Sequence, residues 1–105
     1  YINKISKKYN FIIVSVISPF LKTRKIAKKK FNKNYFEVFV KCKISTLKRR
    51  DTKGLYKLAD EKKIKNLIGY KSKIKYEKSN YNKVLIDTDN LNINSSIQKI
   101  IRNLI

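Results

Sequence analysis

The chain has 105 residues, of which 27 are basic and 7 are acidic, so its formal charge at pH 7 is +20. A single cysteine and the lack of any histidine exclude a disulfide framework and a structural zinc site. The longest apolar run, residues 11–17, is far too short to span a bilayer, and we expect a cytoplasmic protein without a membrane partner.

The first part of the chain predicts a strand and then a helix. Residues 11–17 form a continuous β-branched and aromatic run, which is typical of a strand buried on both faces. Ser18-Pro19 ends this strand, because proline cannot continue a central ladder. Residues 22–30 are strongly basic with Ile26 and Ala27 as apolar positions, which predicts a helix with a narrow buried stripe.

The middle of the chain predicts two more strands with helices between them. We expect a second strand at residues 35–40 and a third at residues 83–87. Between them, residues 44–50 and 55–64 read as helices, and residues 66–82 are polar and lack sustained periodicity, which is typical of a loop.

The chain closes with an amphipathic helix. Asn94 or Ser95 is its predicted cap, because Gln98 lies three residues after Ser95 as in a capping box. The predicted buried face comprises Ile97, Ile100, Ile101 and Leu104. Buried strands that alternate with helices indicate an α/β fold with a parallel sheet flanked by helices. The sequence shows no sign of a second domain, and we expect residues 1–105 to be part of a single domain.

Two segments carry a resemblance to a known family. Ile17-Ser18-Pro19 follows the first predicted strand, and residues 50–59 read Arg-Asp-Thr-Lys-Gly-Leu-Tyr-Lys-Leu-Ala. This resembles the adenylylsulfate kinase family, which carries an I-S-P turn after a strand and an R-D-P-K-G-L-Y-K-K-A lid. Residues 61–69 are similar to the family's G-E-I-K-N-F-T-G segment, and residues 84–88 are similar to its last strand, L-V-I-D-T.

The chain also departs from the family pattern. Leu21 replaces an arginine, Thr52 replaces the lid proline, and Lys62-Lys63 replaces the lid's G-E. Residues 40–43 replace V-D-T-P, and Leu67 replaces the phenylalanine that stacks on the substrate's adenine. A kinase of this family needs a G-x-x-x-x-G-K-[ST] phosphate loop, which a chain with only two glycines does not contain. We therefore expect the C-terminal half of a P-loop-kinase-like domain whose N-terminal half is absent.

The resemblance implies a function and a set of site residues. The reaction is ATP-dependent phosphorylation of the 3′-hydroxyl of adenylylsulfate in sulfate assimilation, with Mg²⁺ held mostly by the absent half. Ser18 is the candidate phosphoserine, and Arg50 and Thr88 are the candidate ATP ligands. The implied substrate residues are Ile17, Ser18, Arg24, Lys53, Leu55, Asn66 and Leu67. The family also leaves open a homodimer and a fused or associated ATP sulfurylase.

Metal binding by this half is not expected. Asp87 ends the third predicted strand and Asp89 follows it, but the chain has only seven acidic residues and no other ligand cluster. Capping and turn roles suit these two carboxylates better.

Two alternatives stay open at this stage. Lys, Ile and Asn, whose codons are mostly A and T, supply 50 of the 105 residues, and only 4 of the 27 basic residues are Arg. An AT-rich coding sequence therefore explains the positive charge as well as a dedicated nucleic-acid-binding face does. A basic module that binds nucleic acid through Lys and Tyr is the first alternative. An inactive remnant of the kinase is the second.

Overall fold

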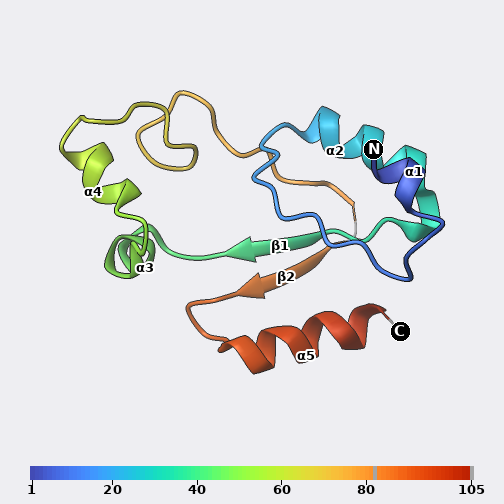
Figure 1. Cartoon of the computed structure of the whole chain (residues 1–105). Coiled ribbons are helices and arrows are strands. Elements are labelled where there is room, and N and C mark those ends of the chain that lie inside the picture. The colour runs from blue at the N-terminus through green and yellow to red at the C-terminus, as the bar shows by residue number, and fades with distance from the viewer. Residues whose placement is uncertain (82, 105) are drawn as a thin grey trace.

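The computed structural model describes residues 1–81 and 83–104 (Figure 1). Its elements run in the order α1 (Ile2–Ile5), α2 (Leu21–Phe31), the 3₁₀ turn η1 (Asn32–Asn34), β1 (Val38–Lys41), α3 (Ile44–Arg50), α4 (Leu55–Asp60), β2 (Val84–Asp87) and α5 (Ile93–Leu104). The chain is therefore a small α/β protein, as the sequence predicts.

The sheet that the described residues form consists of β1 and β2. The two strands are parallel, with Val38 opposite Val84 and Lys41 opposite Asp87. The connection between them carries α3 and α4 beyond the carboxyl end of β1, and α5 packs against β2 (Figure 1). Ile86 is the most deeply buried apolar side chain, with 2% of its surface exposed. The predicted parallel sheet with flanking helices is confirmed for these two strands.

The prediction of a buried strand at residues 11–17 is wrong for this structure. The segment forms no helix or strand, and its apolar side chains other than the half-buried Ile12 are exposed, with Phe11 at 74%, Ile13 at 93% and Ile17 at 61%. A parallel strand buried on both faces needs a hydrogen-bonded neighbour and helices on each face. The sheet of the described residues consists of β1 and β2 alone, so residues 11–17 have neither a neighbouring strand nor covering helices.

Helix α2 matches the predicted residues but not the predicted buried stripe. Ile26 is 61% exposed, whereas Arg24 is 6% exposed and is the buried residue of the helix. The inner side of α2 faces the polar segment that contains Glu77 and Ser79, to which Arg24 donates hydrogen bonds. Polar partners therefore select a polar buried residue at this position.

The closing helix begins earlier than predicted. Asn92 is its cap, because its side-chain oxygen accepts a hydrogen bond from the Ser95 N–H at 2.8 Å. The predicted buried face is mostly wrong, since Ile97, Ile101 and Leu104 are 47%, 42% and 44% exposed, whereas Ile100 is half-buried. The two-stranded sheet is too narrow to cover this helix.

The other elements are close to their predicted bounds. The helix at 44–50 is confirmed, and the strands at 35–40 and 83–87 are shorter than predicted. The helix expected at 55–64 ends at Asp60, because Lys62 turns to a left-handed φ of 59° and the Lys63 N–H bonds back to the Leu58 carbonyl at 2.9 Å. Residues 66–81 contain no helix or strand, and residue 82 lies outside the described residues. No helix in the described ranges is long and apolar enough to cross a membrane.

Candidate functional site

The lysine-rich segment before α4 forms an ordered turn that Asp51 holds. Its two carboxylate oxygens accept hydrogen bonds from the N–H groups of Tyr56 at 3.1 Å and Lys57 at 3.0 Å. Gly54 adopts a left-handed φ of 66°, which brings the chain into the first turn of α4. Lys53 therefore lies in a tight turn with its side chain exposed to solvent. We call residues 51–57 the lid turn.

A charged cluster fixes the far end of α4. The carboxylate of Asp60 accepts hydrogen bonds from Lys48 Nζ at 2.8 Å, Lys71 Nζ at 2.8 Å and the Tyr70 hydroxyl at 2.5 Å. The contacts with Lys48, Lys71 and Tyr70 hold the pKa of Asp60 far below its ordinary value. These contacts tie α3, α4 and the following loop together.

Arg50 and Thr88, the two predicted ATP ligands, are in contact. The Arg50 guanidinium donates to the Thr88 hydroxyl at 3.3 Å and to the Thr88 carbonyl at 2.9 Å. Thr88 itself continues the sheet, since its N–H donates to the Lys41 carbonyl at 2.9 Å. The pair therefore lies at the carboxyl edge of the parallel strands, where open α/β sheets bind their ligands.

A cleft of about 940 Å³ opens beside this pair. Its wall combines the Arg50 and Thr88 side chains with apolar side chains of the sheet and polar side chains at the start of α5. Its lining residues are Val40, Arg50, Ile86, Thr88, Leu91, Asn92, Ile93, Asn94, Ser96, Ile97 and Ile100. An apolar wall with a cation and a hydroxyl at one end suits a nucleotide, whose base needs apolar contact and whose phosphates need a cation.

Asp87 at the end of β2 and Asp89 just after it have the predicted turn and capping roles. Asp87 accepts a hydrogen bond from the Asp89 N–H at 3.1 Å, which closes a tight turn. Asp89 accepts from the Lys43 N–H at 2.7 Å and from the Thr46 hydroxyl at 2.5 Å, and so it caps the start of α3 from across the sheet edge. These bonds from Thr46 and Lys43 lower the pKa of Asp89. Among residues 1–81 and 83–104, no three His, Cys, Asp or Glu side chains are grouped as a metal site.

Ser18 lies in a strained turn before α2. It is half-buried with a left-handed φ of 38°, and within the described chain its hydroxyl makes no hydrogen bond. The Arg24 guanidinium donates to the Ser18 carbonyl at 2.6 Å. Arg24 is only 6% exposed, so the structure turns its charge toward this turn and away from solvent. The predicted contact between Arg24 and the substrate stays a prediction, and the structure shows Arg24 hydrogen-bonded inside the protein.

Three other predicted substrate residues lie in α4 or in the loop that follows it. Leu55 is 39% exposed at the start of α4, and Asn66 and Leu67 lie in the loop that follows α4, where Leu67 is half-buried. In the described part of the chain, no hydrogen bond or ion pair joins Ser18 to Arg50, Lys53 or Thr88. The site residues therefore form two groups: the Ser18 turn, and the lid turn with the adjoining sheet edge, where Arg50 directly precedes Asp51.

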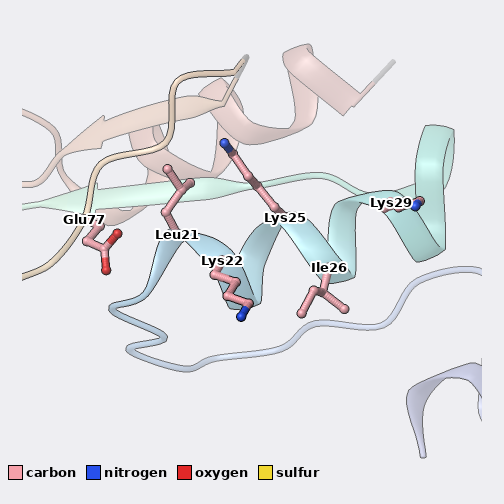
Figure 2. Close-up of a pocket in the computed structure, with 6 residues that line it drawn as sticks. All are labelled: Leu21, Lys22, Lys25, Ile26, Lys29 and Glu77. Carbon is pink, nitrogen blue, oxygen red and sulfur yellow. The ribbon is translucent and has the colours of Figure 1, made fainter.

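A second hollow, of about 390 Å³, runs along α2 (Figure 2). Three lysines, two apolar residues and one glutamate line it: Leu21, Lys22, Lys25, Ile26, Lys29 and Glu77. Figure 2 shows that Lys22 and Lys25 point to opposite sides of the helix. Because these ammonium groups do not converge, the hollow is not built to hold one anion.

Sequence reasoning missed the residues that organise the site. Asp51 is the anchor of the lid turn, and Glu37 and Ser79 complete the contacts of Arg24. Glu37 could have been found, because a lone carboxylate inside an apolar strand-like run needs a buried partner. Ser79 lies in a loop without periodicity, and no signal in the sequence singles it out.

The sequence of this chain matches a known protein family. The family model described as adenylylsulphate kinase matches residues 2–87, which is most of the chain. The chain belongs to the adenylylsulfate kinase family. Its lid turn and its Ser18 turn both lie within the matched residues.

Curated relatives in the adenylylsulfate kinase family cover most of the chain. An adenylyl-sulfate kinase of Clostridium acetobutylicum is 38% identical over 72% of this chain and 37% of its own length. A probable adenylyl-sulfate kinase of Archaeoglobus fulgidus is 36% identical over 82% of this chain and 54% of its own length. A cytidine diphosphoramidate kinase of Campylobacter jejuni is 32% identical over 89% of this chain and 53% of its own length. The chain thus spans about half the length of these relatives, or less.

Proposed function

We propose that these 105 residues are the C-terminal half of an adenylylsulfate kinase domain and that they supply its substrate wall and lid. The reaction is ATP-dependent transfer of a phosphoryl group to the 3′-hydroxyl of adenylylsulfate, as one step of sulfate assimilation. The phosphate loop and the magnesium ligands belong to sequence outside these residues. The observation that carries this proposal is the lid turn, in which a family-specific string adopts an ordered loop that exposes Lys53.

The lid contributes charge at the reacting group. Lys53 approaches adenylylsulfate, and the backbone near Leu55 meets the same ligand. A cation carried by a closing loop stabilises the charge on a phosphoryl group in transfer and displaces water. Asp51 holds the backbone of the turn, so Lys53 is carried on a loop that is already ordered.

ATP is proposed to bind at the carboxyl edge of the sheet. Arg50 and Thr88 are in contact there, beside the cleft with an apolar wall. The adenine of ATP lies against that wall, and the Arg50 guanidinium faces the ATP phosphates. Ser18 and Ile17 form the opposite, adenylylsulfate side, with Asn66 and Leu67 covering the substrate's base.

Calorimetric titration of the 105-residue chain with adenylylsulfate tests this function. We expect binding, and we expect Lys53→Ala to weaken it by about tenfold or more, since a hydrogen bond to a charged group contributes about 1.5–3 kcal/mol. Lys29→Ala is the matched control, because Lys29 is also a lysine but lies on α2, far from the lid turn in the sequence. Equal affinities for the wild type and Lys53→Ala would remove the lid from the mechanism. No binding at all would favour the inactive remnant.

A second substrate is favoured by one relative and one residue. The Campylobacter jejuni relative is a cytidine diphosphoramidate kinase, so the family is not confined to adenylylsulfate. In this chain Leu67 replaces the aromatic residue that stacks on adenine. An aliphatic side chain over the base does not stack on it, and so the site loses the preference for a large base that stacking gives. Competition between adenylylsulfate and a cytidine diphosphate ligand in the same titration decides between the two. Tighter binding of the cytidine ligand would mean that a cytidine nucleotide, and not adenylylsulfate, is the substrate.

A further inference from the structure

Arg24 is a buried cation whose three nitrogens all donate hydrogen bonds inside the protein. It lies on α2 and is 6% exposed. Nη1 donates to the Ser18 carbonyl at 2.6 Å, and Nη2 donates to the Glu77 carbonyl. Nε and Nη2 each lie 3.3 Å from the Ser79 hydroxyl. Its guanidinium carbon also lies 4.5 Å from the centre of the Tyr76 ring. A group held on so many sides has a fixed position.

Glu37 supplies the opposite charge for this arginine. It is 8% exposed, and its Oε1 lies 3.6 Å from Arg24 Nε and accepts a hydrogen bond from Ser79 at 2.5 Å. Its other oxygen accepts from Tyr81 at 2.6 Å and from Tyr35 at 2.9 Å. Burial alone would raise the pKa of Glu37, but the bonds from Ser79, Tyr81 and Tyr35, with the charge of Arg24, hold this pKa below its ordinary value. The Glu37 carboxylate is therefore ionised at neutral pH.

The arginine acts on the Ser18 turn. Ser18 has a φ of 38°, a left-handed conformation that is uncommon for residues other than glycine. Two hydrogen bonds flank it, since the Ser18 carbonyl accepts from Arg24 and the Pro19 carbonyl accepts from the Glu77 N–H at 2.8 Å. An uncommon backbone conformation persists only where its surroundings impose it, and such positions cluster at functional sites. The turn, unlike the arginine, leaves the Ser18 hydroxyl free of partners in the described residues.

We propose that Arg24 is a positioning residue that acts through Ser18. The buried Arg24–Glu37–Ser79 network holds the Ser18 turn in its left-handed form, and this form presents the Ser18 hydroxyl and amide to the substrate. Arg24 itself does not contact the ligand. This inference rests on the proposed function, because it assigns Ser18 to the same adenylylsulfate site.

The structural half of the test follows hydrogen exchange of the Glu77 amide, which reports on the bond to Pro19. Arg24→Lys keeps the charge but replaces the planar guanidinium fork by a single nitrogen, which cannot take the places of Nε, Nη1 and Nη2 together. We therefore expect the Glu77 amide to exchange about tenfold faster. Adding Ser18→Gly should restore most of this protection, because glycine adopts the left-handed turn without help. If Arg24→Lys fails to fold, Ser79→Ala is the milder variant of the same network. Exchange that stays at the wild-type rate, or that Ser18→Gly does not restore, would overturn the proposal.

The functional half of the test measures adenylylsulfate affinity in the same variants. Arg24→Lys is expected to weaken binding about tenfold. Thr46→Val is the control, because Thr46 is also buried and hydrogen-bonded but contacts Asp89 at the sheet edge and not this network. An equal loss of affinity in Thr46→Val would mean that general destabilisation, and not positioning, is responsible. If the wild type does not bind adenylylsulfate, the proposed function fails, while the exchange experiment still decides whether Arg24 holds the turn.

Discussion

Replacing Gly54 by alanine tests whether the lid depends on a left-handed turn. Gly54 has a φ of 66°, and a Cβ atom placed on it would meet no atom within 4 Å. The substitution therefore introduces no clash, and its only cost is conformational. Any effect on the lid must come from the preference of alanine for other backbone conformations.

The free-energy cost of Gly54→Ala to the lid turn has two opposing contributions. A left-handed conformation costs a residue with a Cβ about 1–2 kcal/mol. The lower entropy of the unfolded chain with alanine offsets about 0.4–1 kcal/mol of this cost. The net loss is about 1 kcal/mol, or roughly a fivefold increase in the population of the opened lid turn. Gly54→Asn should lose less, because asparagine adopts this conformation more readily.

Amide hydrogen exchange at Tyr56 and Lys57 is the assay, since both N–H groups bond to Asp51 in the closed turn. Both should exchange roughly five times faster in Gly54→Ala. Gly69→Ala is the matched control: Gly69 also has a left-handed φ, of 85°, with open space around it, but it lies in the loop after α4. It should leave these two amides unchanged. Unchanged exchange in Gly54→Ala itself would refute the lid geometry.

Three further predictions address the core, the buried ion pair and the sheet edge. Ile86→Ala should lower the free energy of unfolding by about 2–4 kcal/mol, because Ile86 is buried. Ile13→Ala should change it by less than about 0.5 kcal/mol, because Ile13 is 93% exposed. Equal losses of stability in urea unfolding would mean that residues 11–17 are packed. The folded pKa of Glu37 lies below its unfolded value of about 4.3, so its contribution is present above that pH and is lost as the pH falls through the folded pKa. Thermal unfolding from pH 6 to pH 3 should show this loss, and Glu37→Gln should flatten it; an unchanged slope would contradict the ion pair. Asp89→Ala should lower the melting temperature and speed exchange of the Lys43 amide, while unchanged exchange would show that Asp89 does not cap α3.

The sequence predicts the local elements better than their packing. The helix at 44–50 and the strand at 83–87 follow from periodicity, and the turn roles of Asp87 and Asp89 follow from their residue type. The strand at 11–17 does not form, because apolar content shows what a segment could bury but not whether a neighbouring strand is there to bond it. The exposed apolar face of α5 has the same cause.

The candidate site divides in a similar way. Motif residues such as Arg50 and Thr88 were found from the resemblance, and the structure places them in contact. The role of Arg24 could not be read from the sequence, because it depends on Ser79, which lies 55 residues away and has no motif of its own. Sequence spacing identifies which side chains carry charge, but only the fold decides which of these charges face inward.

The coding sequence immediately upstream of Tyr1 tests most directly whether these residues are the C-terminal half of an adenylylsulfate kinase domain. The proposal predicts an in-frame G-x-x-x-x-G-K-[ST] phosphate loop that follows a hydrophobic strand. A complete kinase domain would then contain the lid turn and the Ser18 turn described above. A stop codon or an unrelated sequence at that point would contradict the proposal and favour an inactive remnant.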